Sequence, residues 1–323
     1  MANKLPDYVV RPGEPCHQPP FACDSTQLYG FYVEGDRKTI QEKLIDPALN
    51  HPTDGKTNFH TFTDFVMITY SITERGTSTE PPDSDMGYVP EYCWTVWVPV
   101  ISVKKELGLH VAEKLLMYPA FIQVDNAWSL VAGREVYGFP KNQGPLTIPA
   151  PGEDAALFSN QSLAFTTYAA TSKATMVDIM SITRTEKKTT AGEAWDDLGD
   201  AIKAVAGFLH KDGGLPLPGL NLLIQIFELA KHREVPAIFL KQFRDAAEGT
   251  KACYQALVEA GCEVTKFSGG GLLDGTYQIK ACDYPSMPLA SSLGIDPNGA
   301  QAHFPFWTNI DFFVTDIRYP WKA

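Results

Sequence analysis

The stretch GREVYGFPKN, residues 133–142, carries a single lysine, Lys141, behind a run of glycine, proline and aromatic residues. Lysine is strongly hydrated and is normally found at a protein surface, whereas Tyr137 and Phe139 are residue types that commonly pack inside. If such side chains bury Lys141, the loss of water disfavours its ammonium form and lowers its pKa. A neutral lysine amine can attack a carbonyl group and form a Schiff base. The stretch therefore fits either imine chemistry or an ordinary solvated lysine in a turn.

Composition and charge narrow the class of protein. The chain has 323 residues, of which 44% are hydrophobic, as in a soluble globular protein with a full core. Its net charge of −11 argues against nucleic acid as a partner, because phosphate binding needs a basic face. The sequence shows no leader-like N-terminus and no apolar run of about 18 residues. We therefore expect a cytoplasmic protein without a membrane partner.

Cysteine, histidine and glycine patterns give no sign of a metal or nucleotide site. The six cysteines form no C-x-x-C pair, and we expect them to be reduced and mostly structural. The spacing in CHQPPFAC (16–23) matches no zinc template. SGGGLLDG (268–275) lacks the spacing of a dinucleotide-binding loop. No metal or organic cofactor is expected.

Hydrophobic periodicity predicts a β-rich chain with some helices. Asp36 is a plausible N-cap for the first helix, and Pro47 a plausible stop. Strands are expected at 27–35, 62–72, 92–101, 121–124, 129–138, 162–171, 174–185, 237–243, 263–269, 276–283 and 307–319, and helices at 36–49, 108–118, 193–210, 220–232 and 250–261.

Two motifs resemble the acetoacetate decarboxylase family. DNAWSLVAGREVYGFPKN (125–142) is similar to the family segment in which a Gly-Arg-Glu triplet leads to the Schiff-base lysine, and Lys141 falls at that position. YVPEYCWTVWVPV (88–100) is similar to the segment that carries a catalytic glutamate before a core strand, and Glu91 takes that place. The two motifs occur in the family order, and fainter similarity extends to 237–243, 263–275 and 307–314.

The resemblance implies a fold. We expect an α+β, β-rich protein built on a cone-like antiparallel β-barrel of the acetoacetate decarboxylase type, with flanking helices. One domain would span 1–323, with an extended N-terminal arm at 1–25 and a helical insertion at 193–232. The resemblance also implies assembly into homo-oligomers.

The chain departs from the family pattern at three polar positions. Asn142 stands where the decarboxylase has a second lysine. CDSTQLYGF (23–31) lacks the arginine that precedes the first strand, and Val66 or Asp64 stands near the position of a further family glutamate. Retention of the lysine and Glu91 beside these changes favours a retained imine-forming centre with a changed substrate or reaction.

The candidate site residues have alternative roles. Glu91 would transfer protons to the substrate carbon or to a leaving hydroxyl. Arg134 would either hold a substrate carboxylate bidentately or brace the lysine loop. Tyr137, Phe139 and Asn142 are candidate substrate contacts, and packing is the alternative for the two aromatic residues.

Three functions remain open at this level. The first is a carbon–carbon lyase that cleaves a small keto acid, or a related carbonyl compound, through an imine on Lys141. The second is an aldolase-dehydratase that condenses pyruvate-like keto acids with aldehydes. The third is a non-catalytic barrel that binds a small carbonyl ligand. In each, the partner is a small molecule, and the lysine itself supplies the electron sink that a cofactor would otherwise provide.

Overall fold

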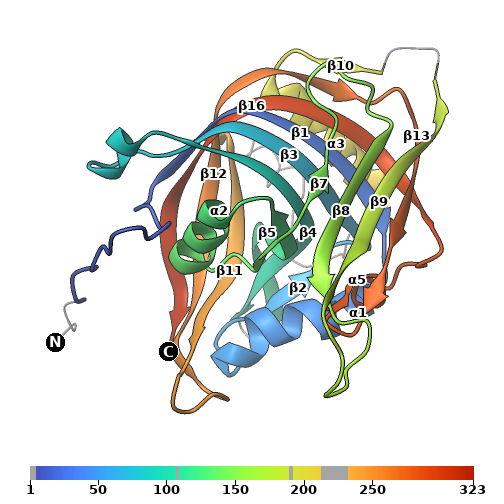
Figure 1. The fold of residues 1–323 in the computed structure, drawn as a ribbon. Coiled ribbons are helices and arrows are strands. Elements are labelled where there is room, and N and C mark those ends of the chain that lie inside the picture. Colours follow the sequence, from blue (N-terminus) through green and yellow to red (C-terminus); the bar gives the residue numbers. More distant parts are fainter. Residues whose placement is uncertain (1–4, 107–108, 189–191, 212–231) are drawn as a thin grey trace.

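Seven long strands close into a barrel at the centre of the protein (Figure 1). The computed structural model describes residues 5–106, 109–188, 192–211 and 232–323. Around the barrel the order of its strands is β12-β11-β5-β4-β3-β1-β16, and β16 pairs with β12 to close the ring. Neighbouring strands are antiparallel except for β5 and β11, which are parallel. The barrel is therefore mixed, and the expectation of an antiparallel barrel is wrong at this seam.

The strands of the described residues alternate with short helices. The strands are β1 (Phe21–Glu34), β2 (Phe59–Thr61), β3 (Phe65–Ser78), β4 (Val89–Glu106), β5 (Leu109–Val124), β6 (Lys141–Gln143), β7 (Leu146–Thr147), β8 (Leu157–Ala164), β9 (Thr175–Lys187), β10 (Ala194–Trp195), β11 (Glu234–Arg244), β12 (Ala252–Leu272), β13 (Gly275–Ala281), β14 (Asp283–Tyr284), β15 (Met287–Pro288) and β16 (Ala300–Lys322). The helices are α1 (Arg37–Ile40), η1 (Gln41–Asn50), η2 (His51–Thr53), η3 (Asp83–Met86), α2 (Ala127–Ala132), η4 (Gly133–Tyr137), α3 (Leu198–Lys211) and α5 (Leu289–Leu293).

The barrel wall has two unlike faces, because successive side chains of a strand point to opposite sides. On β3, the side chains of Val66, Ile68, Tyr70 and Ile72 belong to the main hydrophobic core. The residues between them, among them Thr69, Ser71 and Thr73, line a cavity inside the barrel. One face of the wall therefore supports the fold and the other forms a site.

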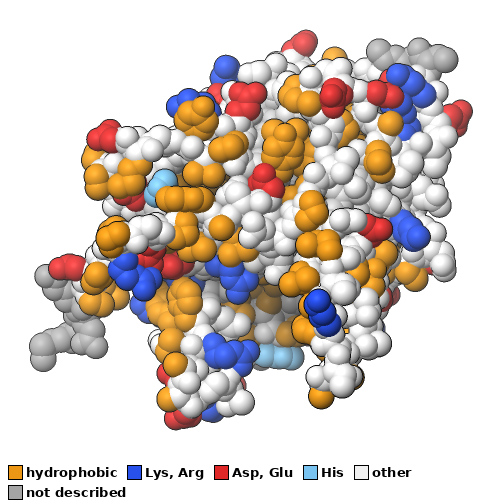
Figure 2. All heavy atoms as spheres, in the orientation of Figure 1, with side chains coloured by type: hydrophobic (Ala, Val, Ile, Leu, Met, Phe, Trp, Pro, Cys, Tyr) orange, Lys and Arg blue, Asp and Glu red, His pale blue; other side chains and the backbone are white. Residues whose placement is uncertain are grey.

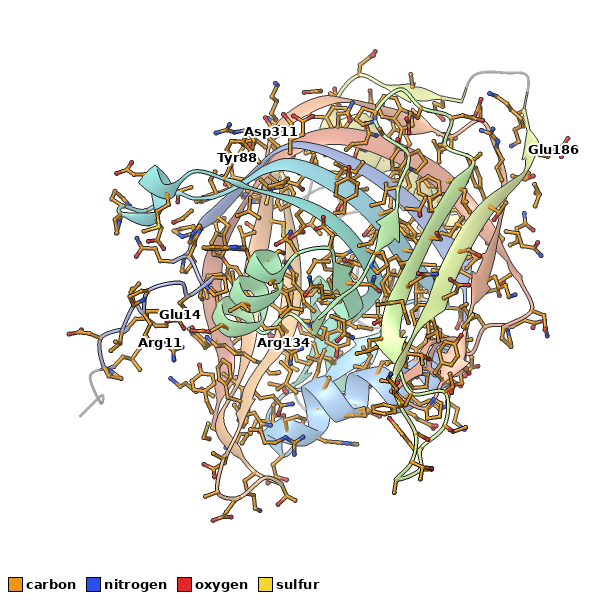
Figure 3. The ribbon with its side chains drawn as sticks, in the orientation of Figure 1. Arg11, Glu14, Tyr88, Arg134, Glu186 and Asp311 are labelled. Atoms are coloured by element: carbon orange, nitrogen blue, oxygen red, sulfur yellow. The ribbon has the colours of Figure 1, made fainter. Side chains whose placement is uncertain are left out.

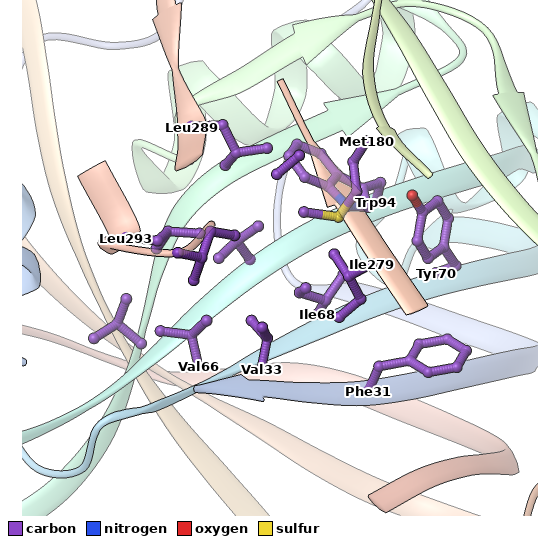
Figure 4. Close-up of a cluster of buried hydrophobic side chains, with 14 of the residues drawn as sticks. Phe31, Val33, Val66, Ile68, Tyr70, Trp94, Met180, Ile279, Leu289 and Leu293 are labelled. Carbon is purple, nitrogen blue, oxygen red and sulfur yellow. The ribbon is translucent and has the colours of Figure 1, made fainter. Parts of the chain in front are cut away.

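The main core lies between the barrel wall and a second layer formed by β8, β9, β13 and α5. Trp94 is almost fully buried there. Figure 4 shows part of this core, with Phe31, Val33, Val66, Ile68, Tyr70 and Trp94 from the barrel strands beside Met180, Ile279, Leu289 and Leu293 from the second layer.

A β-bulge in β1 shifts the alternation of its side chains. The register of β1 against β16 slips between Cys23 and Thr26, and Ser25 adopts a positive φ of 54°. The amide of Ser25 donates to the Asp311 carboxylate at 2.8 Å. In a regular strand, two residues that are three positions apart point to opposite faces. Because of the bulge, Cys23 and Thr26 both line the cavity.

Several sequence expectations were wrong for local elements. Of the expected helix 108–118, residues 109–118 lie in β5, and of the expected helix 250–261, residues 252–261 lie in β12, so both expected helices are strands there. β12 pairs with both β11 and β16, and this long-range pairing overrides the helical periodicity of the segment. The range 129–138 is helical instead of extended, in α2 and η4.

The predictions for the first helix, the N-terminal arm and the insertion were correct only in part. Asp36 caps α1 as expected, accepting from the amide of Thr39, but Pro47 lies inside the following π-helix, which continues to Asn50. β1 begins at Phe21, so residues 21–25 belong to a strand and not to the expected arm. Of the expected insertion at 193–232, β10 and α3 are described; the expected helix 220–232 lies almost wholly outside the described residues.

The surface carries charges of both signs. On the face drawn in Figure 2, acidic and basic side chains are scattered among hydrophobic ones. Among the described helices, none has the length and apolar character needed to span a bilayer.

Candidate active site

The barrel encloses a cavity of about 340 Å³. Its wall is mainly apolar, with hydroxyl and thiol side chains from β1, β3 and β4. Among the described residues, two side chains of the Lys, Arg, Asp and Glu types line the cavity, and these are Lys141 and Glu91. The size suits a small molecule, at the lower end of ligand pockets.

Lys141, Glu91 and Ser129 meet at this cavity. The Nζ atom of Lys141 lies 3.2 Å from Oε2 of Glu91 and 2.5 Å from Oγ of Ser129. The Ser129 hydroxyl also donates to Oε2 of Glu91. The side chains of Lys141 and Glu91 are 12% and 24% exposed, so the ion pair lies largely out of water but is still accessible from the cavity.

The start of α2 is tied to the start of β4, and this brings Ser129 to Glu91. Asn126 is the N-cap of α2, accepting from the amide of Ser129 at 2.8 Å. Its side-chain amide donates to the carbonyl of Pro90 at 3.0 Å, and the Asp125 carboxylate accepts from the amide of Tyr92 at 3.1 Å. These two bonds hold the backbone on both sides of Glu91.

Two glycines allow Lys141 to reach the cavity. A Cβ atom on Gly133 would lie 2.8 Å from both Cδ and Cε of Lys141, so the side chain passes directly over this glycine. Gly138 ends η4 with a φ of +90°, and a Cβ there would lie 2.5 Å from the Cα of Lys241. The glycines of GREVYG are thus needed for a close approach and for a left-handed turn.

Strand alternation explains why the side chain of Lys141 faces the cavity and that of the next residue, Asn142, does not. Lys141 begins β6, which pairs in parallel with β5 so that Lys141 lies opposite Ile122, another residue of the cavity wall. The next side chain on a strand points the other way, and Asn142 is exposed and outside the cavity lining.

The structure favours the ammonium form of Lys141, whose pKa the sequence left open. Burial is the largest single effect and lowers the pKa of Lys141. The Glu91 carboxylate, together with smaller contributions from Cys93 and Cys23, outweighs it, so that the pKa is raised above its ordinary value. The sequence alone could not decide this, because the balance between burial and facing charges depends on distances in the folded protein. The resting site is therefore an ammonium–carboxylate pair.

Three partly buried cysteines line the same cavity: Cys23, Cys93 and Cys262. Burial raises the pKa of Cys93 and of Cys262 to about 12, and it also raises the pKa of Cys23. They are therefore neutral at physiological pH and act as small apolar wall residues. All six cysteines of the chain are free.

Of the other residues predicted from the sequence, some line the cavity and some lie outside it. Tyr137 and Phe139 line the cavity. Arg134 does not: it is exposed, lies below α2 in Figure 3, and donates to the backbone carbonyl of Lys141 at 3.0 Å. Its position corresponds to the bracing alternative. Val66 lies in the core, and Asp64 faces Arg37 at 3.6 Å, so neither replaces the family glutamate in the cavity.

The N-terminal segment closes over one side of the cavity. Arg11 and Glu14 lie on the part of it that extends outside the barrel (Figure 3). Nearer the barrel, Pro15 and His17 line the cavity, and the His17 ring lies 4.9 Å from that of Trp128 on α2. The Tyr8 hydroxyl donates to Glu135 of η4 at 2.7 Å.

Ser129 was missed by the sequence reasoning. Its segment was interpreted as a strand, and alternation gave no reason to place its side chain beside Glu91. The signal that would have found it is Asn126 three residues before Ser129, the spacing of a helix N-cap and the amide that it binds. Among the described residues, no cluster of three or more His, Cys, Asp or Glu side chains is arranged to hold a metal ion.

The fold is a closed mixed β-barrel, and a largely buried lysine–carboxylate pair lies at its cavity. No protein-family model matches the chain, and no curated protein sequence matches it. Solved structures do: acetoacetate decarboxylase from Legionella pneumophila aligns with a TM-score of 0.60 at 11% identity, over 100% of this chain and 94% of that chain. The chain thus has the acetoacetate decarboxylase fold.

Two other solved structures extend this likeness. An acetoacetate decarboxylase-like enzyme from Sphingomonas wittichii RW1 has a TM-score of 0.57 at 13% identity, over 96% of both chains. The enduracididine biosynthesis enzyme MppR, in complex with pyruvate, has a TM-score of 0.55 at 11% identity, over 96% of this chain and 93% of that chain. MppR has also been solved with the condensation product of pyruvate and imidazole 4-carboxaldehyde.

Proposed function

We propose that this protein is a carbon–carbon lyase that forms a Schiff base between Lys141 and a small keto acid or related carbonyl compound. The observation that carries the proposal is the contact of the Lys141 amine with Glu91 and Ser129 at the wall of an enclosed, mainly apolar cavity. The acetoacetate decarboxylase fold adds support, because an enzyme of that fold acts on a keto acid.

The pair of Lys141 and Glu91 provides the proton transfers of imine formation. Glu91 takes a proton from the Lys141 ammonium, and the free amine attacks the carbonyl carbon. The same proton is returned to the carbonyl oxygen. Glu91 then passes a second proton from the nitrogen of the adduct to that oxygen, which leaves as water while the protonated imine forms. The protonated imine then accepts the electron pair of the bond that breaks next. Glu91, protonated by solvent in a decarboxylation or by the substrate hydroxyl in an aldol cleavage, delivers that proton to the carbon left behind.

Ser129 has a positioning role in this scheme. Its hydroxyl contacts both the amine and the carboxylate, so it holds the two groups in one geometry while the proton moves between them. Because its amide is bound by the Asn126 cap, the serine is fixed to the end of a helix and not to a mobile loop.

Aldol condensation followed by dehydration is the second candidate. The likeness to MppR favours it, since that enzyme has been solved with pyruvate and with a condensation product of pyruvate and an aldehyde. Both reactions start from the same imine and need the same proton transfers, so the residues proposed here serve either one.

The experiment is reductive trapping. The protein is incubated with borohydride and a panel of acetoacetate, pyruvate and simple ketones, and the adduct is located by peptide mass mapping. We expect an adduct on Lys141 that disappears in Lys141→Ala. A panel that leaves Lys141 unmodified throughout contradicts the proposal and favours a non-catalytic binding barrel.

Lys241 provides the matched control. It is a second partly buried lysine close to the same loop, with its Nζ donating to the carbonyl of Val136 at 2.9 Å. Burial lowers the pKa of Lys241, so unspecific imine formation would select it. Lys241→Arg keeps the hydrogen-bond donor and should leave the trapping of Lys141 unchanged.

A further inference from the structure

The cavity that holds Lys141 runs along two neighbouring strands, β3 and β4 (Figure 1). On β4, Glu91 lies beside the lysine amine, and Trp97 lines the same cavity six residues farther along. On β3, Thr73 pairs with Glu91 and Met67 pairs with Trp97, and both of these residues line the cavity. Six residues of strand extend about 20 Å, so the cavity continues well beyond the reacting amine.

Small side chains form the wall between these two ends. Cys93 and Thr95 follow Glu91 on β4, and Ser71 and Thr69 pair with them on β3. All four of these side chains line the cavity. The interior of a small barrel is only just wide enough for side chains to fill it, or to hold one small ligand. Short side chains along the wall therefore leave room for a ligand in the middle of the barrel.

The far end of the cavity is lined by large apolar side chains. The indole N–H of Trp97 donates to the hydroxyl of Thr69 at 3.0 Å, so its polar atom is already bonded and the rest of the ring is apolar surface. Met117 of β5 also lines the cavity, and it pairs with Pro99, two residues beyond Trp97 on β4. A ligand that reaches this end therefore meets an aromatic ring and a flexible thioether chain.

Part of α3 packs behind this apolar end. Leu28 and Met67 line the cavity and also pack against a second hydrophobic cluster. Trp195 of β10 and Leu209 of α3 are buried members of that cluster. The described part of the expected insertion at 193–232 thus backs the apolar end of the cavity.

We infer that the substrate is an amphiphilic carbonyl compound, whose carbonyl carbon reacts with Lys141 and whose apolar chain lies along β3 and β4 and reaches Trp97 and Met117. This inference rests on the proposed function of Lys141, and it adds the part of the substrate that does not react. Placing the chain in the cavity is favourable because it removes apolar surface of the chain and of the wall from water. A compound as short as acetone would leave the far end of the cavity without contact.

Two pairs of carbonyl compounds test the inference: acetone with 2-octanone, and pyruvate with 2-oxooctanoate. The members of each pair differ by five methylene groups. Each compound is trapped on Lys141 with cyanoborohydride, the adduct is located by peptide mass mapping, and the concentration that gives half-maximal trapping is measured. Burying one methylene group strengthens binding roughly three- to fourfold, so the longer member of a reacting pair should need an at least about hundredfold lower concentration.

Met117→Gln tests the apolar end away from the imine centre. Glutamine has about the length of methionine, but it places an amide where the apolar chain would lie, and the chain cannot bond that amide. We expect the advantage of the longer compound over the shorter one to fall about tenfold. Met176→Gln is the matched control, because Met176 is 50% exposed on β9 and lies outside the cavity lining. It should leave the advantage of the longer compound unchanged.

The results separate the inference from the proposed function. If the long member of every reacting pair is favoured by less than about tenfold, the inference is overturned while the Schiff-base function stands. If folded Met117→Gln keeps the full wild-type advantage, the chain does not reach Met117, and this also overturns the inference. If all four compounds leave Lys141 unmodified, the proposed function fails and the inference fails with it.

Discussion

The Nζ atom of Lys141 lies 3.2 Å from Oε2 of Glu91, although 50 positions separate the two residues in the chain. This contact decides the protonation state of the lysine. Burial lowers the pKa of Lys141, the Glu91 carboxylate and the smaller contributions of Cys93 and Cys23 raise it, and the net shift is upward.

Glu91→Gln should therefore reverse the pKa shift of Lys141. Without the carboxylate, burial is the dominant effect, and the pKa of Lys141 should fall below the ordinary lysine value. Imine trapping would then begin at lower pH than in the wild type. The pH dependence of borohydride trapping measures this, and a profile that does not move would show that Glu91 does not control the lysine.

Glu91→Gln should also reverse the sign of the contribution that Lys141 makes to the change in unfolding free energy with pH. In the wild type the raised pKa of Lys141 contributes stability that is fully present below the ordinary lysine pKa of about 10.4 and is lost as the pH rises through the native value. In Glu91→Gln the unfolded chain binds the proton more tightly, so the contribution of Lys141 should grow with rising pH. Urea unfolding of both proteins over alkaline pH compares the two slopes.

Gly133→Ala should displace Lys141 while leaving the fold intact. The backbone at Gly133 is already helical, with a φ of −64°, so alanine fits the chain, but its Cβ would lie 2.8 Å from Cδ and Cε of Lys141. We expect trapping to fall by about tenfold or more, as for other small misplacements of a reacting group. Retained far-UV circular dichroism would show that the loss is local.

Gly207→Ala is the matched control for this glycine. Gly207 lies in α3, and a Cβ there would meet nothing within 4 Å. Alanine should stabilise the helix by up to about 1 kcal/mol and leave trapping unchanged. Equal loss of trapping in both variants would argue against the close approach of Gly133 to the lysine.

Asn126→Ala should weaken both α2 and the site. The variant removes the N-cap of the helix, which typically costs about 1 kcal/mol, and it frees the amide of Ser129. We expect a lower urea midpoint together with slower trapping. Asp36→Ala removes the cap of α1, away from the cavity. It should affect trapping far less, and similar effects of the two variants on trapping would contradict the positioning role of Asn126.

Asn142→Lys tests the departure from the family pattern directly. Because Asn142 is exposed and points away from the cavity, a lysine there would be solvated and its charge screened from Lys141. We expect the pH profile of trapping to remain that of the wild type. A shift of that profile to lower pH would show that the introduced ammonium reaches the lysine.

Local patterns predicted much of the barrel but not its closure. Apolar, β-branched and aromatic residues predicted the strands at 62–72 and 92–101, which overlap β3 and β4, because such side chains fit the surface of a sheet. The segment 250–261 was misread, since its helical spacing carries no information about β11 and β16, its partners in space.

The candidate site was also predicted only in part. Lys141 and Glu91 were found from motifs, and the structure brings them into contact. Arg134 and Asn142 were selected by proximity in sequence to the lysine, yet helical geometry turns one to the backbone of Lys141 and strand alternation turns the other outward.

The sequence by itself identified several strands of the barrel wall and singled out Lys141 and Glu91 as candidate site residues. Only the tertiary structure decided that Ser129 joins them and that the pKa of Lys141 is raised. The reason is physical: strand and turn preferences act between neighbours in the chain, whereas a pKa depends on charges and burial contributed by segments far apart in it.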